Sequence, residues 1–402
     1  MMRRREFLPV AGAGAGALMA AAEKKRVAGV VTEYRHYSHA DVVLGRIMSG
    51  NSSEGVHHAP RTRLVSLYTA QQPQGTDMAP DMSSRYGFKL YPTIKEALTL
   101  GGDKLAVDAV VFIGEHGKYP DNELGQKMYP RFELFSEVLD VFEASGRVVP
   151  TFFDKHLSYD WTKAKTMYDR AKKLNLPWMA GSSIPVTVRT PLLEIPIDTP
   201  LDAAVGVGYG PLDAYGFHLL ESLQCMVERR AGGETGVSSV EWIQGNGVWD
   251  WLKGTGAWAR PLIDAAVARN PHRKPQTIEE EAKNPVMFVL NYTDGLKGAG
   301  FILGPSGADW TFACRRKNAT AIESTFFGLP QRGRTLPHFD GLVKCMEDMF
   351  LSGKPVYPVE RTLLTTGMLA LLFQSKKLGG KRETPELAVS YRAPKNCYFQ
   401  RA

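Results

Sequence analysis

The chain has 402 residues, of which 44% are hydrophobic and 23% are charged. The 49 Lys and Arg residues outnumber the 42 Asp and Glu residues, so the formal net charge is +7. This balance is typical of a globular protein and excludes a disordered, collagen-like or disulfide-scaffold chain. At roughly 100–200 residues per domain, the length allows two domains. Because the basic residues are scattered, we predict no nucleic-acid partner.

Residues 1–22 have the pattern of a twin-arginine export signal. Arg4 and Arg5 precede Phe7, a weakly apolar Ala/Gly stretch follows, and an A-x-A-like cleavage site falls after Ala22. The apolar stretch is too short to span a bilayer. We therefore predict export to the periplasm or the medium, with no membrane segment in the mature chain. A disordered Ala/Gly tail with chance arginines is the alternative.

Short apolar runs alternate with amphipathic helical patterns in the first part of the chain. Strands are predicted at 26–31, 64–68, 107–113 and 147–153, and helices around 42–48, 94–98 and 131–144. This alternation predicts a Rossmann-like dinucleotide-binding domain of the α/β class, with a doubly wound parallel sheet, over residues 23–157. Ligands of such domains bind at the carboxyl ends of the strands.

Strand patterns predominate in the remainder of the chain, after one more helix at 161–171. Strands are predicted at 201–209, 237–244, 286–292, 298–303 and 310–314, with Asp294-Gly295 as a hairpin turn. Helices at 218–228 and 360–373 are predicted to cover one face of this sheet. Residues 158–402 are therefore expected to form an α+β domain on an open, mostly antiparallel sheet.

The first strand leads into a polar segment instead of the G-x-G-x-x-G loop that lets a pyrophosphate approach a helix N-terminus. All three glycines are absent from residues 32–41. Arg35 and the start of the helix are candidates to face a phosphate here, and a plain surface loop is the alternative. The predicted cofactor contacts in this segment are Thr32, Glu33, Tyr34, Arg35 and His36.

The next two strand ends complete the predicted cofactor site. The second strand ends at Tyr68 and Thr69 without the acidic residue that usually binds the ribose, so NAD and NADP stay open. Gly114, Glu115 and His116 follow the third strand. With His36 and His39, Glu115 and His116 have ligand types that suit a divalent metal, but hydrogen bonding is the use we expect.

Two further motifs carry candidate catalytic side chains. Asp154-Lys155-His156 directly follows the fourth strand at the junction of the domains, so Lys155 is expected to donate to a substrate hydroxyl. His218 follows a Gly-containing segment with Asp213 and Tyr215 nearby, which favours an acid–base role. An exposed strand-capping lysine and a core histidine are the respective alternatives.

Together these motifs resemble the Gfo/Idh/MocA family of sugar and inositol oxidoreductases. The family's E-K-P motif is similar to Asp154-Lys155-His156, and its glycine-rich element ending in histidine is similar to residues 209–218. The resemblance implies catalytic or nicotinamide-contacting roles for Lys155 and a catalytic role for His218. Ala214 stands where the family has aspartate, and Asp213 lies one residue earlier.

The resemblance implies an exported oxidoreductase that acts on a sugar, cyclitol or glycoside with tightly bound NAD or NADP. His218 would accept the hydroxyl proton, assisted by Asp213, Lys155 would polarise the same oxygen, and His156 and Tyr215 would contact substrate. The exposed face of the second sheet would form a homo-oligomer surface.

Two rival functions stay open beside the oxidoreductase. One is a lyase, hydrolase or isomerase, with or without a metal, and the other is a silent carbohydrate-binding protein. The rival enzyme would use His36, His39, Glu115, His116 and His218.

Overall fold

The computed structural model describes residues 23–52, 56–273, 275–303, 310–328, 336–396 and 398–401, so the predicted export signal lies outside the described residues. The first sheet and its helices run in the order β1 (Lys25–Val31), α1 (His39–Ser49), β2 (Thr62–Thr69), α2 (Ala79–Tyr86), β3 (Lys89–Leu90), α3 (Ile94–Thr99), β4 (Ala109–Ile113), α4 (Arg131–Ser145), β5 (Thr151–Asp154), α5 (Trp161–Lys173) and β6 (Trp178–Gly181).

The six strands form a parallel sheet in the order β3-β2-β1-β4-β5-β6, which is the doubly wound Rossmann order. Successive side chains of β1 alternate between the two faces because the strand period is two. Ala28 and Val30 pack on the side of α3 and α4, whereas Val27 and Val31 pack on the side of α1. Burial on both faces explains why these strands read as continuous apolar runs, and the predicted Rossmann-like sheet is confirmed.

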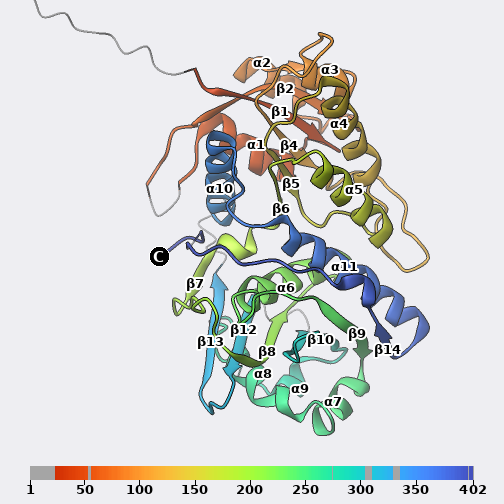
Figure 1. The fold of residues 1–402 in the computed structure, drawn as a ribbon, viewed down its shortest axis with the longest axis vertical. Coiled ribbons are helices and arrows are strands. Elements are labelled where there is room, and N and C mark those ends of the chain that lie inside the picture. Colours follow the sequence, from red (N-terminus) through yellow and green to blue (C-terminus); the bar gives the residue numbers. More distant parts are fainter. Residues whose placement is uncertain are drawn as a thin grey trace, which may run out of the picture.

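The first sheet extends beyond residue 157, where the sequence placed the end of its domain, because β6 pairs with β5 in parallel. Helix α10 (His338–Ser352), from late in the chain, also returns to this domain and packs on α1. Figure 1 shows α10, in blue, beside the red and orange N-terminal elements. Strand β6 and helix α10, which both follow residue 157, therefore complete the N-terminal domain.

The second sheet has eight strands in the order β14-β9-β10-β11-β8-β12-β13-β7. These are β7 (Val188–Thr190), β8 (Leu201–Gly208), β9 (Val237–Gln244), β10 (Val286–Tyr292), β11 (Lys297–Ile302), β12 (Trp310–Arg316), β13 (Ile322–Gly328) and β14 (Lys381–Glu383). Only β8 and β11 pair in parallel, so the predicted mostly antiparallel sheet is confirmed. The turn at Asp294-Gly295 joins β10 to β11 as expected.

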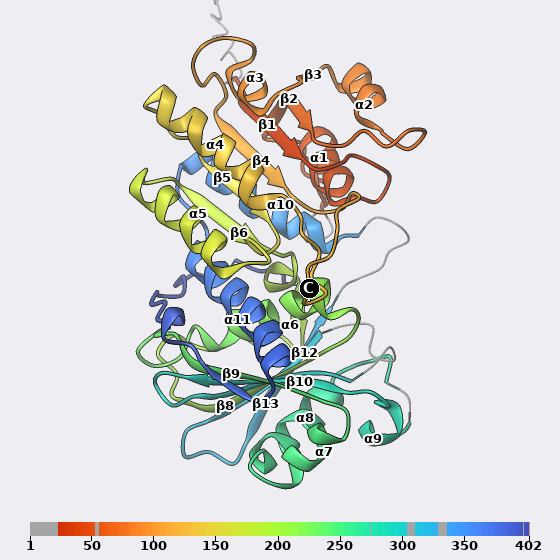
Figure 2. The same cartoon turned by 90° about the vertical axis from the view of Figure 1, so that its right-hand side faces the viewer.

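Helices cover both faces of the second sheet. On one face lie α6 (Leu212–Val227) and α11 (Val359–Leu378), as predicted, and on the other lie α7 (Asn246–Lys253), α8 (Arg260–Val267) and α9 (Ile278–Glu281). Leu262 and Ile263 of α8 pack against Val205 and Ala313 of the sheet. Figure 2 shows α7, α8 and α9 beneath the sheet. The expectation that this face is exposed for oligomer contacts is therefore wrong.

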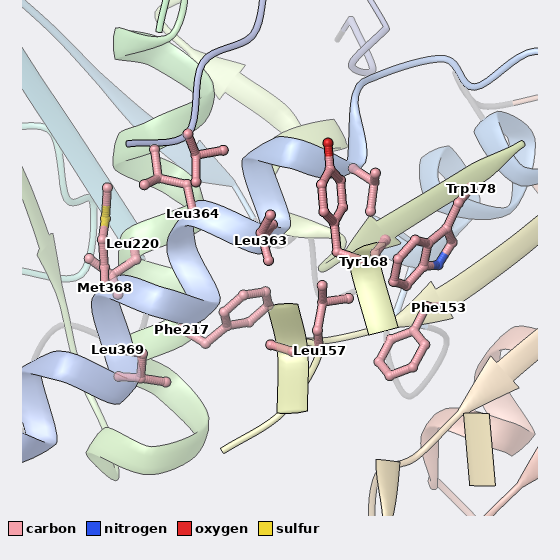
Figure 3. Packing of buried hydrophobic residues seen from close by; sticks show 14 of the residues in the cluster. Phe153, Leu157, Tyr168, Trp178, Phe217, Leu220, Leu363, Leu364, Met368 and Leu369 are labelled. Atoms are coloured by element: carbon pink, nitrogen blue, oxygen red, sulfur yellow. The ribbon is translucent and has the colours of Figure 1, made fainter. Parts of the chain in front are cut away.

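The two domains share a continuous hydrophobic core at their junction. Phe153 of β5 and Trp178 of β6 belong to the same cluster as Phe217 of α6 and Met368 of α11. Figure 3 shows α11 running between α6 and the ends of the strands. No helix among the described residues is long and apolar enough to cross a membrane. The shared core fixes the end of β5 against α6, and the candidate catalytic side chains come from these two elements.

Candidate active site

Lys155 leaves the first sheet at the end of β5 through a turn with left-handed backbone geometry. Its φ is +72°, and its backbone N–H donates to the carbonyl oxygen of Gly181 at 3.0 Å. Such a conformation is costly for a residue with a side chain and persists only where its surroundings hold it. The turn directs Lys155 into the junction, where its side chain is buried.

Lys155 and His218 meet at this junction. Lys155 Nζ lies 2.6 Å from His218 Nε2, although 63 residues separate the two in sequence. Burial and the neighbouring Lys155 ammonium lower the pKa of His218 well below its ordinary value. The imidazole is therefore neutral, with Nε2 as the acceptor and Nδ1 as a buried donor that has no partner among the described residues. Lys155 and His218 are therefore adjacent, as the sequence predicted.

A buried ionic chain lies beside this pair. Arg131, the first residue of α4, donates from Nη2 to Glu115 Oε2 at 2.5 Å and lies 2.7 Å from His156 Nε2 through Nη1. Burial raises the pKa of Glu115, but Lys155 and Arg131 outweigh it and hold that pKa well below its usual range. Glu115 is thus an anion that balances two buried cations. Burial and Arg131 likewise lower the pKa of His156.

The loop after β1 is held by its own polar groups. Arg35 Nε donates to Glu33 Oε1 at 2.5 Å, and Arg35 Nη2 lies 3.4 Å from His116 Nδ1. Thr32 Oγ1 donates to the carbonyl oxygen of Glu115 at 2.6 Å. Burial and His39 lower the pKa of His116 to about 4. Arg35 therefore links Glu33 to His116 at the strand ends, and Thr32 binds the backbone of Glu115.

Of the remaining predicted cofactor contacts, one is a core residue and the others lie at strand ends. Tyr34 is fully buried in the core beneath α1, so its predicted contact with a cofactor is wrong. Thr69 Oγ1 accepts a hydrogen bond from Gln72, and Tyr68 is half-buried at the end of β2. Gly114 is needed for packing, because a Cβ there would lie 2.7 Å from Arg131 Cγ.

The histidines proposed as metal ligands do not converge. The His36 side chain is 66% exposed and lies 3.5 Å from Asp41, whereas the His39 side chain turns inward to Asp154. His39 Nδ1 lies 2.7 Å from Asp154 Oδ2, and the rings of His39 and His116 are 5.3 Å apart. Within the described ranges, no group of three or more His, Cys, Asp or Glu side chains is placed to hold a metal ion.

Aromatic rings surround His218 on the second-domain side. Tyr215 meets the imidazole edge-on with 5.9 Å between ring centroids, and Trp310 of β12 lies at 5.4 Å. Tyr209 packs on both of these aromatic residues. Asp213 does not reach His218 by a hydrogen bond in the described part of the chain, because its Oδ2 accepts from the backbone N–H of Lys127 at 2.9 Å.

Sequence reasoning missed three residues of this site: Arg131, Trp310 and His338. His338 begins α10, more than 110 residues after His218, and burial lowers its pKa to about 3 together with Arg46, His39 and Lys155. No local motif marks His338 or Trp310. Arg131 carried a weak signal, as the one basic residue at the start of an otherwise apolar helical stripe.

The chain has the Gfo/Idh/MocA fold, in which a Rossmann-type sheet is followed by a large open sheet domain. No protein-family model and no curated protein matches the sequence. The similarity to solved structures shows the fold.

The chain is similar to GenD2 from gentamicin A biosynthesis in complex with NAD, with 13% identity, a TM-score of 0.57, and coverage of 90% of this chain and 96% of that chain. A myo-inositol 2-dehydrogenase from Lactobacillus plantarum has 11% identity and a TM-score of 0.52, with coverage of 90% and 99%. A super-repressor mutant of Gal80p from Saccharomyces cerevisiae has 10% identity and a TM-score of 0.53, with coverage of 91% and 100%.

The start of α1 does not fit a pyrophosphate in the usual Rossmann position. Ser38 caps the helix by accepting from the backbone N–H of Asp41, and the Asp41 carboxylate accepts from the backbone N–H of Tyr37 at 3.0 Å. Arg35, expected to face a phosphate, is already bound to Glu33. A pyrophosphate here would meet two protein carboxylates where it needs free N–H groups.

Proposed function

We propose that this chain is an enzyme acting on one hydroxyl group of a sugar, cyclitol or glycoside, with Lys155 and His218 at the reacting oxygen. The observation that carries the proposal is the 2.6 Å separation of Lys155 Nζ and His218 Nε2 at the buried junction of the domains. A hydroxyl beside both nitrogens meets a cationic donor and a neutral base. Tyr215, which is partly exposed beside His218, is the aromatic side chain placed to contact the ring of the substrate.

Lys155 and His218 have different roles at that oxygen. His218 is neutral because burial and Lys155 lower its pKa, so it accepts the hydroxyl proton. Lys155 then stabilises the negative charge that develops on the oxygen. Since Lys155 occupies His218 Nε2 in the structure, a substrate hydroxyl enters by sharing this hydrogen bond.

Oxidation of the hydroxyl is the first reaction we propose, because solved structures with this fold include an inositol dehydrogenase and a protein in complex with NAD. NAD or NADP would supply the hydride acceptor. It would have to bind away from the self-capped start of α1. We also propose export through the signal at residues 1–22, with the cofactor carried along in tightly bound form.

A non-redox reaction at the same oxygen, such as an elimination or an isomerisation, is the second candidate. The specific observation in its favour is the start of α1, where Glu33 and Asp41 stand in place of a phosphate site. Acid–base chemistry at Lys155 and His218 needs no dinucleotide.

Nicotinamide content separates the two candidates. We would record the absorbance of the purified protein in the nicotinamide band and identify any released ligand by mass spectrometry, with metal analysis on the same sample. The redox proposal expects about one nucleotide per chain and its reduction by myo-inositol or a sugar. Absence of nucleotide, even after incubation with NAD and NADP, contradicts it and favours the non-redox enzyme. Sugar binding without any turnover would identify a silent binding protein.

A further inference from the structure

A carboxylate–imidazole pair, Asp154 and His39, connects the end of β5 to the start of α1 at the carboxyl edge of the first sheet. Asp154 ends β5 and His39 begins α1, 115 residues apart, and His39 Nδ1 lies 2.7 Å from Asp154 Oδ2. Asp154 is fully buried, and the His39 side chain keeps 17% of its surface exposed. The buried anion is thus beside an imidazole that small molecules can still reach.

The hydrogen bond fixes which nitrogen of His39 is the base. A carboxylate only accepts, so Nδ1 of His39 carries the hydrogen of this bond, and Nε2 is the nitrogen left to act as an acceptor whenever the ring is neutral. A buried carboxylate that orients an imidazole and stabilises its protonated form is the arrangement of a general base.

His39 faces the same site as Lys155 and His218. Asp154 is the residue before Lys155, and the His39 ring lies 5.3 Å from that of His116. Burial is the largest cause that lowers the pKa values of His116 and His218. The neighbouring His39 is the next cause for His116, and for His218 it follows Lys155. His39 therefore stands at the start of α1, where a dinucleotide pyrophosphate would otherwise lie.

We propose that His39, oriented by Asp154, is a second catalytic base, which removes a proton from the carbon beside a carbonyl group that accepts a hydrogen bond from Lys155 next to His218. The substrate class is the keto form of a cyclitol or sugar. This step deepens the proposed function and rests on its assignment of Lys155 and His218 to a substrate oxygen.

The step balances without an oxidant. His39 Nε2 takes the proton, the C–H electron pair becomes the C=C bond of an enolate, and the carbonyl π pair moves to oxygen. The Lys155 ammonium stabilises the enolate oxygen, and the Asp154 carboxylate stabilises the His39 imidazolium. Return of a proton to carbon regenerates both the ketone and neutral His39.

A purely structural tie between α1 and β5 is the competing explanation. A tie needs one hydrogen bond, which a neutral side chain provides without the cost of burying a charge. Asp154 Oδ1 is buried without a partner in the described part of the chain, so this oxygen does not anchor a neighbouring group. This favours a carboxylate kept for its charge next to the imidazole.

Proton exchange with a keto-cyclitol tests the proposal. We would incubate the full chain with 2-keto-myo-inositol in D₂O and follow, by NMR, deuterium entering the carbons beside the carbonyl. Exchange is expected to exceed the buffer rate and to fall about 10²–10⁴-fold in His39→Asn. His272→Asn is the matched control, because His272 is exposed in the second domain, follows α8, and should leave the rate unchanged. A wild-type rate equal to that of buffer, or an unchanged rate in His39→Asn, overturns the proposal.

Ring ¹⁵N NMR of His39 gives a readout that does not depend on substrate. Wild-type protein is expected to carry the hydrogen on Nδ1, and Asp154→Asn, which preserves shape, should lose this preference. A wild-type ring protonated at Nε2 overturns the dyad. If exchange persists in Lys155→Ala while inositol is never oxidised, the proposed function fails and the dyad stands.

Discussion

Single side chains determine the chemistry at the junction of the domains, and Lys155 and His218 give the most direct test. Replacing either one by alanine removes the cationic donor or the base at the reacting oxygen. We expect turnover to fall about 10²–10⁴-fold in each variant. The double variant should lose less than the product of the two, because the groups act as a unit. Steady-state kinetics with circular dichroism checks the result, and full activity of His218→Ala would remove the assignment.

Residue types at strand ends were predictable from the sequence, but their partners were not. Lys155 and His218 were found because each follows a clear local pattern, a strand end and a helix start. Tyr34 was assigned to a cofactor for the same reason, yet its ring turns into the apolar core. Arg131, Trp310 and His338 reach the site only through folding, since no local sequence pattern records which distant elements become neighbours. Hydrogen-bond partners depend on distances that only the three-dimensional structure supplies.

At the scale of elements, the strands and helices with regular periodicity were predicted well. Helix α10, which comes late in the chain and packs on the first domain, was not predicted. Buried parallel strands such as β1 and β4 are continuous apolar runs, and α4 has a regular apolar stripe. Helix α10 is apolar over most of its surface, because it packs both on α1 and on its own domain. Such a helix carries no pattern that reveals which domain it joins.

A buried ion pair joins α10 to α1 beside their apolar contacts. Arg46 Nε donates to Asp340 Oδ1 at 2.6 Å, with side chains 12% and 7% exposed. Asp340→Ala leaves a buried guanidinium without this partner, so we expect a loss of about 3–5 kcal/mol in the free energy of unfolding. Asp348→Ala, in the exposed pair with Arg61 on the same helix, is the control and should cost about 1 kcal/mol or less. Urea unfolding measures both, and equal losses would show that the Arg46 pair does not anchor α10.

At the scale of the whole molecule, the predicted export signal decides where the protein works. We expect Arg4→Lys with Arg5→Lys to keep the protein in the cytoplasm, because the export machinery recognises the paired arginines. Arg3→Lys is the matched control, since it makes the same substitution at a neighbouring arginine, keeps the charge and leaves the pair intact. Cell fractionation with immunodetection measures the distribution. Normal export of the double variant would contradict the proposed signal.

The buried histidines of the site make the stability of the whole protein depend on pH. Burial lowers the pKa of His116 to about 4 and that of His338 to about 3, and it also lowers those of His156 and His218. In the unfolded chain a histidine has a pKa of about 6.5. Between these values the unfolded state binds more protons than the folded state, so these groups destabilise the protein as pH falls below about 6.5. Burial raises the pKa values of Glu221 and Glu228, and these carboxyls act in the opposite direction.

A difference between two variants isolates one histidine from these opposing groups. In His338→Gln the buried imidazole is replaced by a neutral side chain that binds no proton in either state. The slope of unfolding free energy against pH, measured by urea unfolding between pH 6 and pH 4.5, should therefore decrease by about 1.4 kcal/mol per pH unit relative to wild type. An unaltered slope in His338→Gln would show that His338 takes up its proton in the folded protein as readily as in the unfolded chain, and that the start of α10 is open to water.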